Sequence, residues 1–125
     1  HALSRCVFAA GALARLGPDG LPVDFHNAPR NYTVYIGKAE GTNVDAYVGI
    51  TNDLARRKRE WKGVYELREV VTDLTKKEAR AVEQVIMNRN PHFRNINNAI
   101  DRRHRWYRKA IEWAERAVKG RRLRR

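Results

Sequence analysis

The segment from Tyr47 to Arg57 constrains the fold more than any other part of the chain. It starts with the alternation typical of a strand, turns at the polar residues 51–53, and continues as a basic stretch suited to a helix. A second strand-like segment, 33–37, lies upstream, and its Tyr35 has the same phase as Tyr47. Two tyrosines on neighbouring strands and an arginine one helical turn past a strand end can converge on one point.

Hydrophobic periodicity and turn residues predict an α+β fold with a small three-stranded sheet, made from a β-hairpin, a helix and a third strand, and flanked by helices. We expect three segments: an N-terminal helix and linker (1–30), a core (31–98), and a long basic C-terminal helix with its tail (99–125). By residue number, the expected elements are helix 2–16, strands 31–38 and 46–51, a helix capped by Thr51 or Asn52 and ending near 61, strand 64–71, helix 75–88 and helix 99–119.

The helix over 75–88 has the clearest local signals. Thr75 and Glu78 have the spacing of a capping box, in which each side chain satisfies a backbone donor of the other. Glu83 borders the apolar stripe of this helix and therefore lies either at the edge of the core, aimed at a ligand, or on the surface beside Arg80 or Arg89. The stripe itself consists of Ala79, Val82, Val85 and Ile86.

Charge indicates the class of partner. The formal net charge is +12 at pH 7, which favours polyanions: nucleic acid first, then an anionic membrane surface, then an acidic protein. A single cysteine, Cys6, excludes an internal disulfide and a cysteine-rich zinc site. No apolar run approaches the roughly 20 residues of a membrane span. The chain also lacks a glycine-rich phosphate loop and the sequence patterns of zinc proteases and serine hydrolases.

Two triplets, Thr33-Val34-Tyr35 and Tyr47-Val48-Gly49, followed by the turn and helix over 50–57, resemble the motifs of the GIY-YIG nuclease family. The resemblance covers about residues 31–98 and places the family's catalytic arginine at Arg57. Its metal-binding glutamate corresponds to Glu83, and its asparagine after a proline-containing turn to Asn95.

The register of the first tyrosine needs a choice, because Tyr35-Ile36-Gly37 also spells the second motif. That alternative would place the arginine at Asp45, so Tyr35 belongs to the first motif. Two positions depart from the family pattern. Thr33 replaces the first glycine, and Trp61 stands where many members carry a histidine or tyrosine. Because tryptophan cannot accept a proton, Tyr35, Lys58 or a metal-bound water would have to act as the base or proton relay.

The resemblance implies a metal-dependent endonuclease, with DNA expected ahead of RNA as substrate. Glu83 would hold Mg²⁺ or another divalent cation, and Tyr35 would orient or deprotonate the attacking water with Tyr47 positioning it. Arg57 would neutralise charge on the phosphate, and Asn95 would hold the loop or the substrate. Basic residues expected to contact nucleic acid are Arg56, Lys58, Arg59, Arg102, Arg103, Arg105, Arg108 and Lys109.

Several biological settings remain open for such a chain. A compact and highly basic nuclease resembles the C-terminal toxin domains of interbacterial effectors, which are secreted or delivered into the cytoplasm of a target bacterium and are bound by an acidic immunity protein. A homing, restriction or repair nuclease domain is an alternative. A nucleic-acid-binding module without catalysis is another, and a membrane-surface protein using the apolar helix over 2–16 and the basic tail is a third.

Overall fold

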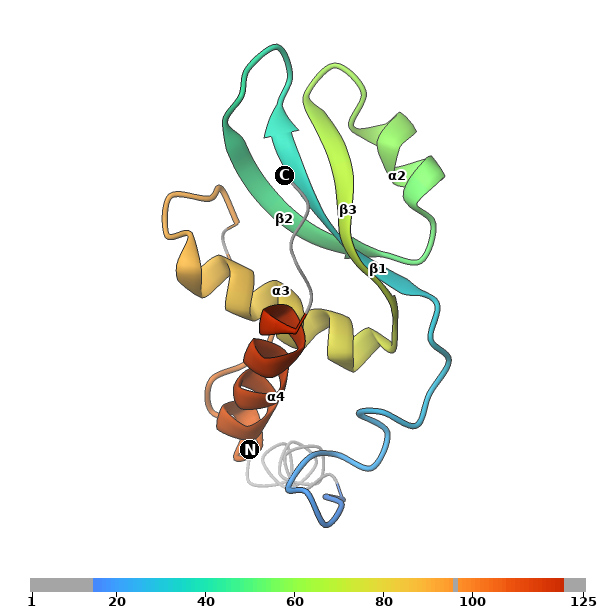
Figure 1. The fold of residues 1–125 in the computed structure, drawn as a ribbon, viewed down its shortest axis with the longest axis vertical. Helices are drawn as coiled ribbons and strands as arrows, with labels where there is room; N and C mark the ends of the chain where they lie inside the picture. The colour runs from blue at the N-terminus through green and yellow to red at the C-terminus, as the bar shows by residue number, and fades with distance from the viewer. Residues whose placement is uncertain (1–14, 96, 121–125) are drawn as a thin grey trace, which may run out of the picture.

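The computed structural model describes residues 15–95 and 97–120 (Figure 1). Its elements are β1 (Tyr32–Ala39), β2 (Asp45–Thr51), α2 (Leu54–Glu60), β3 (Tyr65–Leu74), α3 (Lys76–Arg89) and α4 (Tyr107–Lys119). The predicted α+β class, with a hairpin, a helix and then a third strand, is confirmed. The helix expected over 2–16 falls outside the described residues except for its last two, where Leu16 instead forms an isolated bridge with Pro22. None of the helices in the described ranges is long and apolar enough to cross a membrane.

The strands form one antiparallel sheet in the order β2-β1-β3, so β1 is central. β3 continues to Leu74, and the prediction that it ends before residues 72–73 is wrong. The pairing of β1 with β3 shifts register twice beside Val34, and Asp73 on β3 has a left-handed backbone with a φ of 60°. Pairing therefore resumes between Tyr32 and Leu74.

The hydrophobic core lies between the sheet and α3, and α4 packs on α3 (Figure 1). All four apolar positions of the predicted α3 stripe are buried. The three predicted segments share this one core, because it also contains Leu21 and Phe25 from the linker and Ile100, Trp106, Ala110, Ala114 and Val118 from the C-terminal segment.

The C-terminal helix begins at Tyr107, so the prediction that it starts near residue 99 is wrong. Gln84 is fully buried, and its Oε1 accepts hydrogen bonds from the backbone N–H groups of residues 99–100 at 2.8 and 3.2 Å. The Asp101 carboxylate accepts another from the backbone N–H of Arg103 at 2.9 Å. Such side-chain acceptors compete with helix formation, and this segment forms turns before α4.

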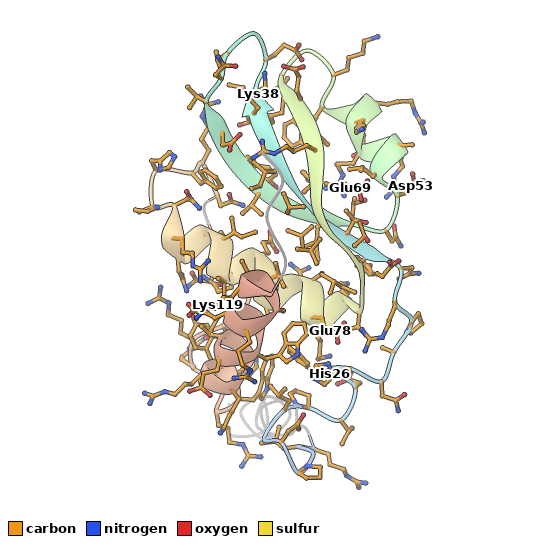
Figure 2. All side chains as sticks on the ribbon, in the orientation of Figure 1. His26, Lys38, Asp53, Glu69, Glu78 and Lys119 are labelled. Atoms are coloured by element: carbon orange, nitrogen blue, oxygen red, sulfur yellow. The ribbon has the colours of Figure 1, made fainter. Side chains whose placement is uncertain are left out.

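A buried carboxylate joins the linker to the start of α3. Glu78 is 1% exposed and completes the capping box by accepting from the Thr75 backbone N–H at 2.8 Å. Its two oxygens also contact His26 Nδ1 at 2.5 Å and Arg30 Nη1 at 2.6 Å. Figure 2 shows His26 and Glu78 side by side at this junction. The sequence predicts the cap, but the two partners from the linker become visible only in the fold.

Replacing Glu78 tests how strongly this junction stabilises the protein. Glu78→Ala removes the cap acceptor and the anion, and we expect the free energy of unfolding to fall by about 2–3 kcal/mol. Glu78→Gln retains an acceptor for the Thr75 N–H and should lose less. Urea unfolding measures both, with the exposed Glu112→Ala as control, expected within about 0.5 kcal/mol of wild type. Equal losses for Glu78→Ala and Glu112→Ala would contradict a stabilising junction.

Candidate functional site

Tyr35 is the centre of the site. It lies on the central strand, is fully buried, and its hydroxyl accepts a hydrogen bond from Arg57 Nη1 at 3.0 Å. Gly49 pairs with Tyr35 across β1 and β2, and a Cβ added to Gly49 would lie 2.3 Å from the tyrosine hydroxyl oxygen. The glycine of the second motif therefore leaves the space through which the Tyr35 hydroxyl reaches α2.

Helix α2 carries Arg57 in its last turn, four residues after the cap. The prediction that Thr51 or Asn52 caps this helix is wrong, because Asp53 is the N-cap and accepts from the Arg56 backbone N–H at 3.0 Å. Thr51 instead accepts from the Asp53 backbone N–H at 3.0 Å and holds the turn. Arg57 Nε lies 3.0 Å from a Glu60 oxygen, in an ion pair without hydrogen-bond geometry.

Tyr47 belongs to an aromatic cluster next to Tyr35. Its ring stacks on Tyr65 at 5.7 Å between centroids, and lies 5.8 Å from Trp61 and 6.3 Å from Tyr35. Burial raises the pKa of the Tyr47 hydroxyl, nearby Tyr35 and Glu83 add to this, and Arg57 opposes it. Tyr47 therefore keeps its proton at neutral pH. Tyr65 was not among the predicted site residues, although its place at the start of a strand after Trp61 could have indicated it.

Glu83 is buried in α3 and not on the surface, so the surface interpretation is wrong. Its Oε1 has no hydrogen-bond partner, and Arg80 Nη1 lies 3.8 Å away. Arg89, the other expected partner, lies 3.9 Å from Glu115 instead. Burial raises the pKa of the Glu83 carboxyl to about 7, and the Arg80 charge only partly opposes the rise. A buried acid with a strongly raised pKa that borders a pocket is a candidate functional group.

Glu83 and Tyr47 line one pocket of about 310 Å³. Tyr35 and Arg57 are not in its wall and reach it through the contact of Tyr35 with Tyr47. The other residues lining the pocket are Arg80, Arg94, Asn95, Asn97, Asn98 and Ala99.

The donor set of this pocket fits a hard cation better than a soft one. Within residues 15–95 and 97–120, no three His, Cys, Asp or Glu side chains gather to form a metal site. The pocket does contain the Glu83 carboxylate, whose Oε1 has no hydrogen-bond partner, and three asparagines, of which Asn95 and Asn98 already accept hydrogen bonds through Oδ1. Mg²⁺ in proteins binds through one or two carboxylates and keeps several waters, so the orphan Glu83 oxygen fits it.

Asn95 borders the pocket, but its amide has backbone partners. Its Oδ1 accepts from the Val48 N–H at 3.1 Å and its Nδ2 donates to the Val48 carbonyl at 2.7 Å. The neighbouring Arg94 backbone N–H donates to the Ala46 carbonyl at 2.8 Å. Asn95 therefore holds its loop against the outer edge of β2, and both groups of its amide are engaged there.

The predicted nucleic-acid-binding residues fall into two groups, both exposed. The first is on α2: Arg56, Lys58 and Arg59. The second precedes or begins α4, and contains Arg102, Arg103, Arg105, Arg108 and Lys109. Arg103 contacts the Asp101 carboxylate at 2.8 Å, so part of its charge is neutralised. Arg80 was expected only as a surface partner of Glu83, and Arg94 was not among the predicted site residues, although both line the pocket.

Comparisons with protein-family models, curated proteins and solved structures gave no significant match to this chain. In this structure Arg57 donates to the Tyr35 hydroxyl, the Tyr35 ring contacts Tyr47, and Tyr47 lines one pocket with the buried carboxylate of Glu83.

Gly49→Ala tests the packing of Tyr35. The new methyl would overlap the tyrosine hydroxyl, at 2.3 Å, and its ring carbon, at 2.5 Å. We expect a loss of about 1–3 kcal/mol in the free energy of unfolding, because a closely packed ring must move. Tyr35→Phe, which removes the hydroxyl without a clash, should lose only about 1 kcal/mol. Urea unfolding compares the two, and a Gly49→Ala variant as stable as wild type would refute this packing.

Glu83→Gln tests the buried acid through the pH dependence of stability. Because the pKa of Glu83 is raised from 4.5 to about 7, the folded state binds more protons than the unfolded state between these values. Wild-type stability should therefore fall as pH rises through this window. A difference of one in pKa corresponds to about 1.4 kcal/mol, so the cost at pH 8 is on the order of 3 kcal/mol.

The glutamine variant removes this cost, so its stability relative to wild type should increase from pH 5 to pH 8. Urea unfolding at several pH values measures the difference, with the exposed Glu112→Gln as control. Parallel stability curves for wild type and Glu83→Gln would show that Glu83 ionises normally.

Proposed function

We propose that this protein is a metal-dependent endonuclease of the GIY-YIG type, which hydrolyses phosphodiester bonds of nucleic acid, with DNA ahead of RNA. One observation carries the proposal. The Arg57–Tyr35 hydrogen bond lies beside Tyr47, and Tyr47 lines the same pocket as the unpartnered Glu83 carboxylate. Phosphodiester hydrolysis needs charge neutralisation and an oriented nucleophile, and these side chains offer both.

The two tyrosines would have different roles in the reaction. Arg57 donates to the Tyr35 oxygen, and Tyr35 is buried outside the pocket wall, so it would act on the attacking water indirectly, by holding Arg57 and Tyr47 in place. Tyr47 keeps its proton because its pKa is raised, and so would position the water as a hydrogen-bond donor without deprotonating it. The charge of Arg57 would stabilise the negative charge that builds up on the phosphate.

Glu83 would hold the divalent cation, with its unpartnered Oε1 as the ligand. When bound there, Mg²⁺ supplies neutralisation of the phosphate oxygens. Asn95 would contribute indirectly, since its amide fastens the pocket loop to Val48.

Affinity would come mainly from the phosphate backbone. The net charge of +12 supports strong and salt-dependent binding to nucleic acid. If about six phosphates are contacted, binding should weaken on the order of a thousandfold between 50 and 200 mM salt. The same charge suits an acidic immunity protein as partner, and a toxin domain delivered into a target bacterium is the setting we propose.

A cleavage assay tests the function directly. Plasmid DNA and tRNA are incubated with the protein, with and without Mg²⁺, at a protein concentration that binds both. We expect Mg²⁺-dependent cleavage by wild type, a loss of at least about a hundredfold in rate for Glu83→Gln, and unchanged rates for the control Glu112→Gln. Binding by Glu83→Gln should remain close to wild type. Absence of cleavage of either substrate, under conditions of binding, would refute the proposal.

A nucleic-acid-binding module without catalysis is the second candidate. It is favoured by Trp61, which packs against Tyr47 and Tyr65 where a proton-handling residue is expected. In the same assay this candidate predicts metal-independent binding with a steep salt dependence and an intact substrate.

A further inference from the structure

A second pocket, of about 320 Å³, adjoins the candidate site. Both pockets have Arg80 and Ala99 in their walls, so they are neighbours along α3. Its other residues are Lys76, Lys77, Ile100, Asp101, His104 and Trp106. None of these six side chains lines the pocket of Glu83.

The side chains that line the second pocket carry more positive than negative charge. Lys76, Lys77 and Arg80 contribute three cations, of which Lys77 pairs with Asp24 at 2.9 Å and Arg80 lies 3.8 Å from Glu83 in the neighbouring pocket. The one carboxylate in the wall, Asp101, contacts Arg103 at 2.8 Å. Lys76 is exposed at the first position of α3. A pocket with this balance attracts an anion.

An aromatic wall accompanies the cations. The His104 ring stacks on the Trp106 ring, with 4.7 Å between centroids and 15° between planes. Trp106 is buried in the core, and His104, which is half-buried, covers it. Cations next to a planar ring are the combination with which proteins bind single-stranded nucleic acid, through phosphate contacts and base stacking.

The spacing along α3 links the two pockets. Lys76, Arg80 and Glu83 follow each other by four and three residues, so they lie on one face of the helix. At a rise of 1.5 Å per residue, Lys76 and Glu83 are about 10 Å apart along the axis. That length corresponds to about three nucleotides of one strand at 3.4 Å each.

We propose that this second pocket is a subsite for a phosphate that flanks the scissile bond on the same strand. Lys76 and Arg80 bind the phosphate, and the His104 ring faces the adjoining base. The strand would run along α3 from the Glu83 pocket toward the start of the helix. The inference rests on the proposed nuclease function and adds to it the path of the substrate and two positioning residues.

Nuclear magnetic resonance can test the subsite without any cleavage. The ¹⁵N-labelled protein is titrated with the trinucleotide d(TpTpT), and separately with inorganic phosphate, in the absence of divalent cations. The indole N–H of Trp106 reports on the subsite, that of Trp61 on the tyrosine cluster, and that of Trp113, which lines neither pocket, serves as reference. We expect saturable shifts at Trp106 and at the backbone N–H of His104, and smaller shifts at Trp113.

Variants make the test specific. Lys76→Ala should weaken trinucleotide binding roughly threefold to fivefold, the effect of losing one exposed charge contact. It should also lower the salt slope of binding by about 0.7, as expected for one phosphate of a single strand. The matched control is Lys119→Ala, an exposed lysine on α4 outside both pockets, which should bind like wild type.

Three outcomes would overturn the subsite: shifts at Trp61 without shifts at Trp106, equal affinity of Lys76→Ala and wild type, or inorganic phosphate binding as tightly as the trinucleotide. The plasmid assay separates this failure from that of the nuclease. Mg²⁺-dependent cleavage combined with any of these outcomes refutes the subsite alone. Saturable trinucleotide shifts at Trp106, weakened by Lys76→Ala, without cleavage would show that a strand binds at this pocket and would refute hydrolysis, and with it the role beside a scissile bond.

Discussion

The hydrogen bond between Arg57 and the buried Tyr35 hydroxyl is the interaction on which the site depends. A buried phenol needs a partner for its polar atom, and here the partner comes from α2. Because Gly49 has no side chain, the Tyr35 ring can lie across β2 and reach that helix. One contact therefore fixes β1, β2 and α2 relative to one another and sets where Tyr47 meets the pocket.

The two buried glutamates of α3 show why Glu83 is of functional interest. Glu78 accepts from the Thr75 backbone N–H and contacts His26 and Arg30, so its buried charge is well compensated. Glu83 is also buried, but its Oε1 has no hydrogen-bond partner and its pKa is raised to about 7. The first carboxylate stabilises the fold, whereas the second costs free energy in the folded protein alone. A bound cation would compensate that cost.

Much of the fold could be predicted from local patterns, but the relations between distant side chains could not. The hairpin, the capping box at Thr75 and the α3 stripe follow from spacing within a few residues. The start of α4 was mispredicted because Gln84, on another helix, accepts from the backbone at 99–100. Likewise, the pairing of Asn95 with Val48 depends on a loop returning to the sheet edge.

The sequence by itself determined the α+β class, the placing of Tyr35 and Tyr47 on two neighbouring strands, and a charge of +12 suited to polyanions. These properties depend on composition and on short-range periodicity, which a chain carries before it folds. Only the tertiary structure decided that Glu83 is buried with no hydrogen-bond partner for its Oε1 and that Arg80 is shared by two adjoining pockets. Burial and convergence depend on which distant residues pack around a side chain, and no local pattern specifies those neighbours.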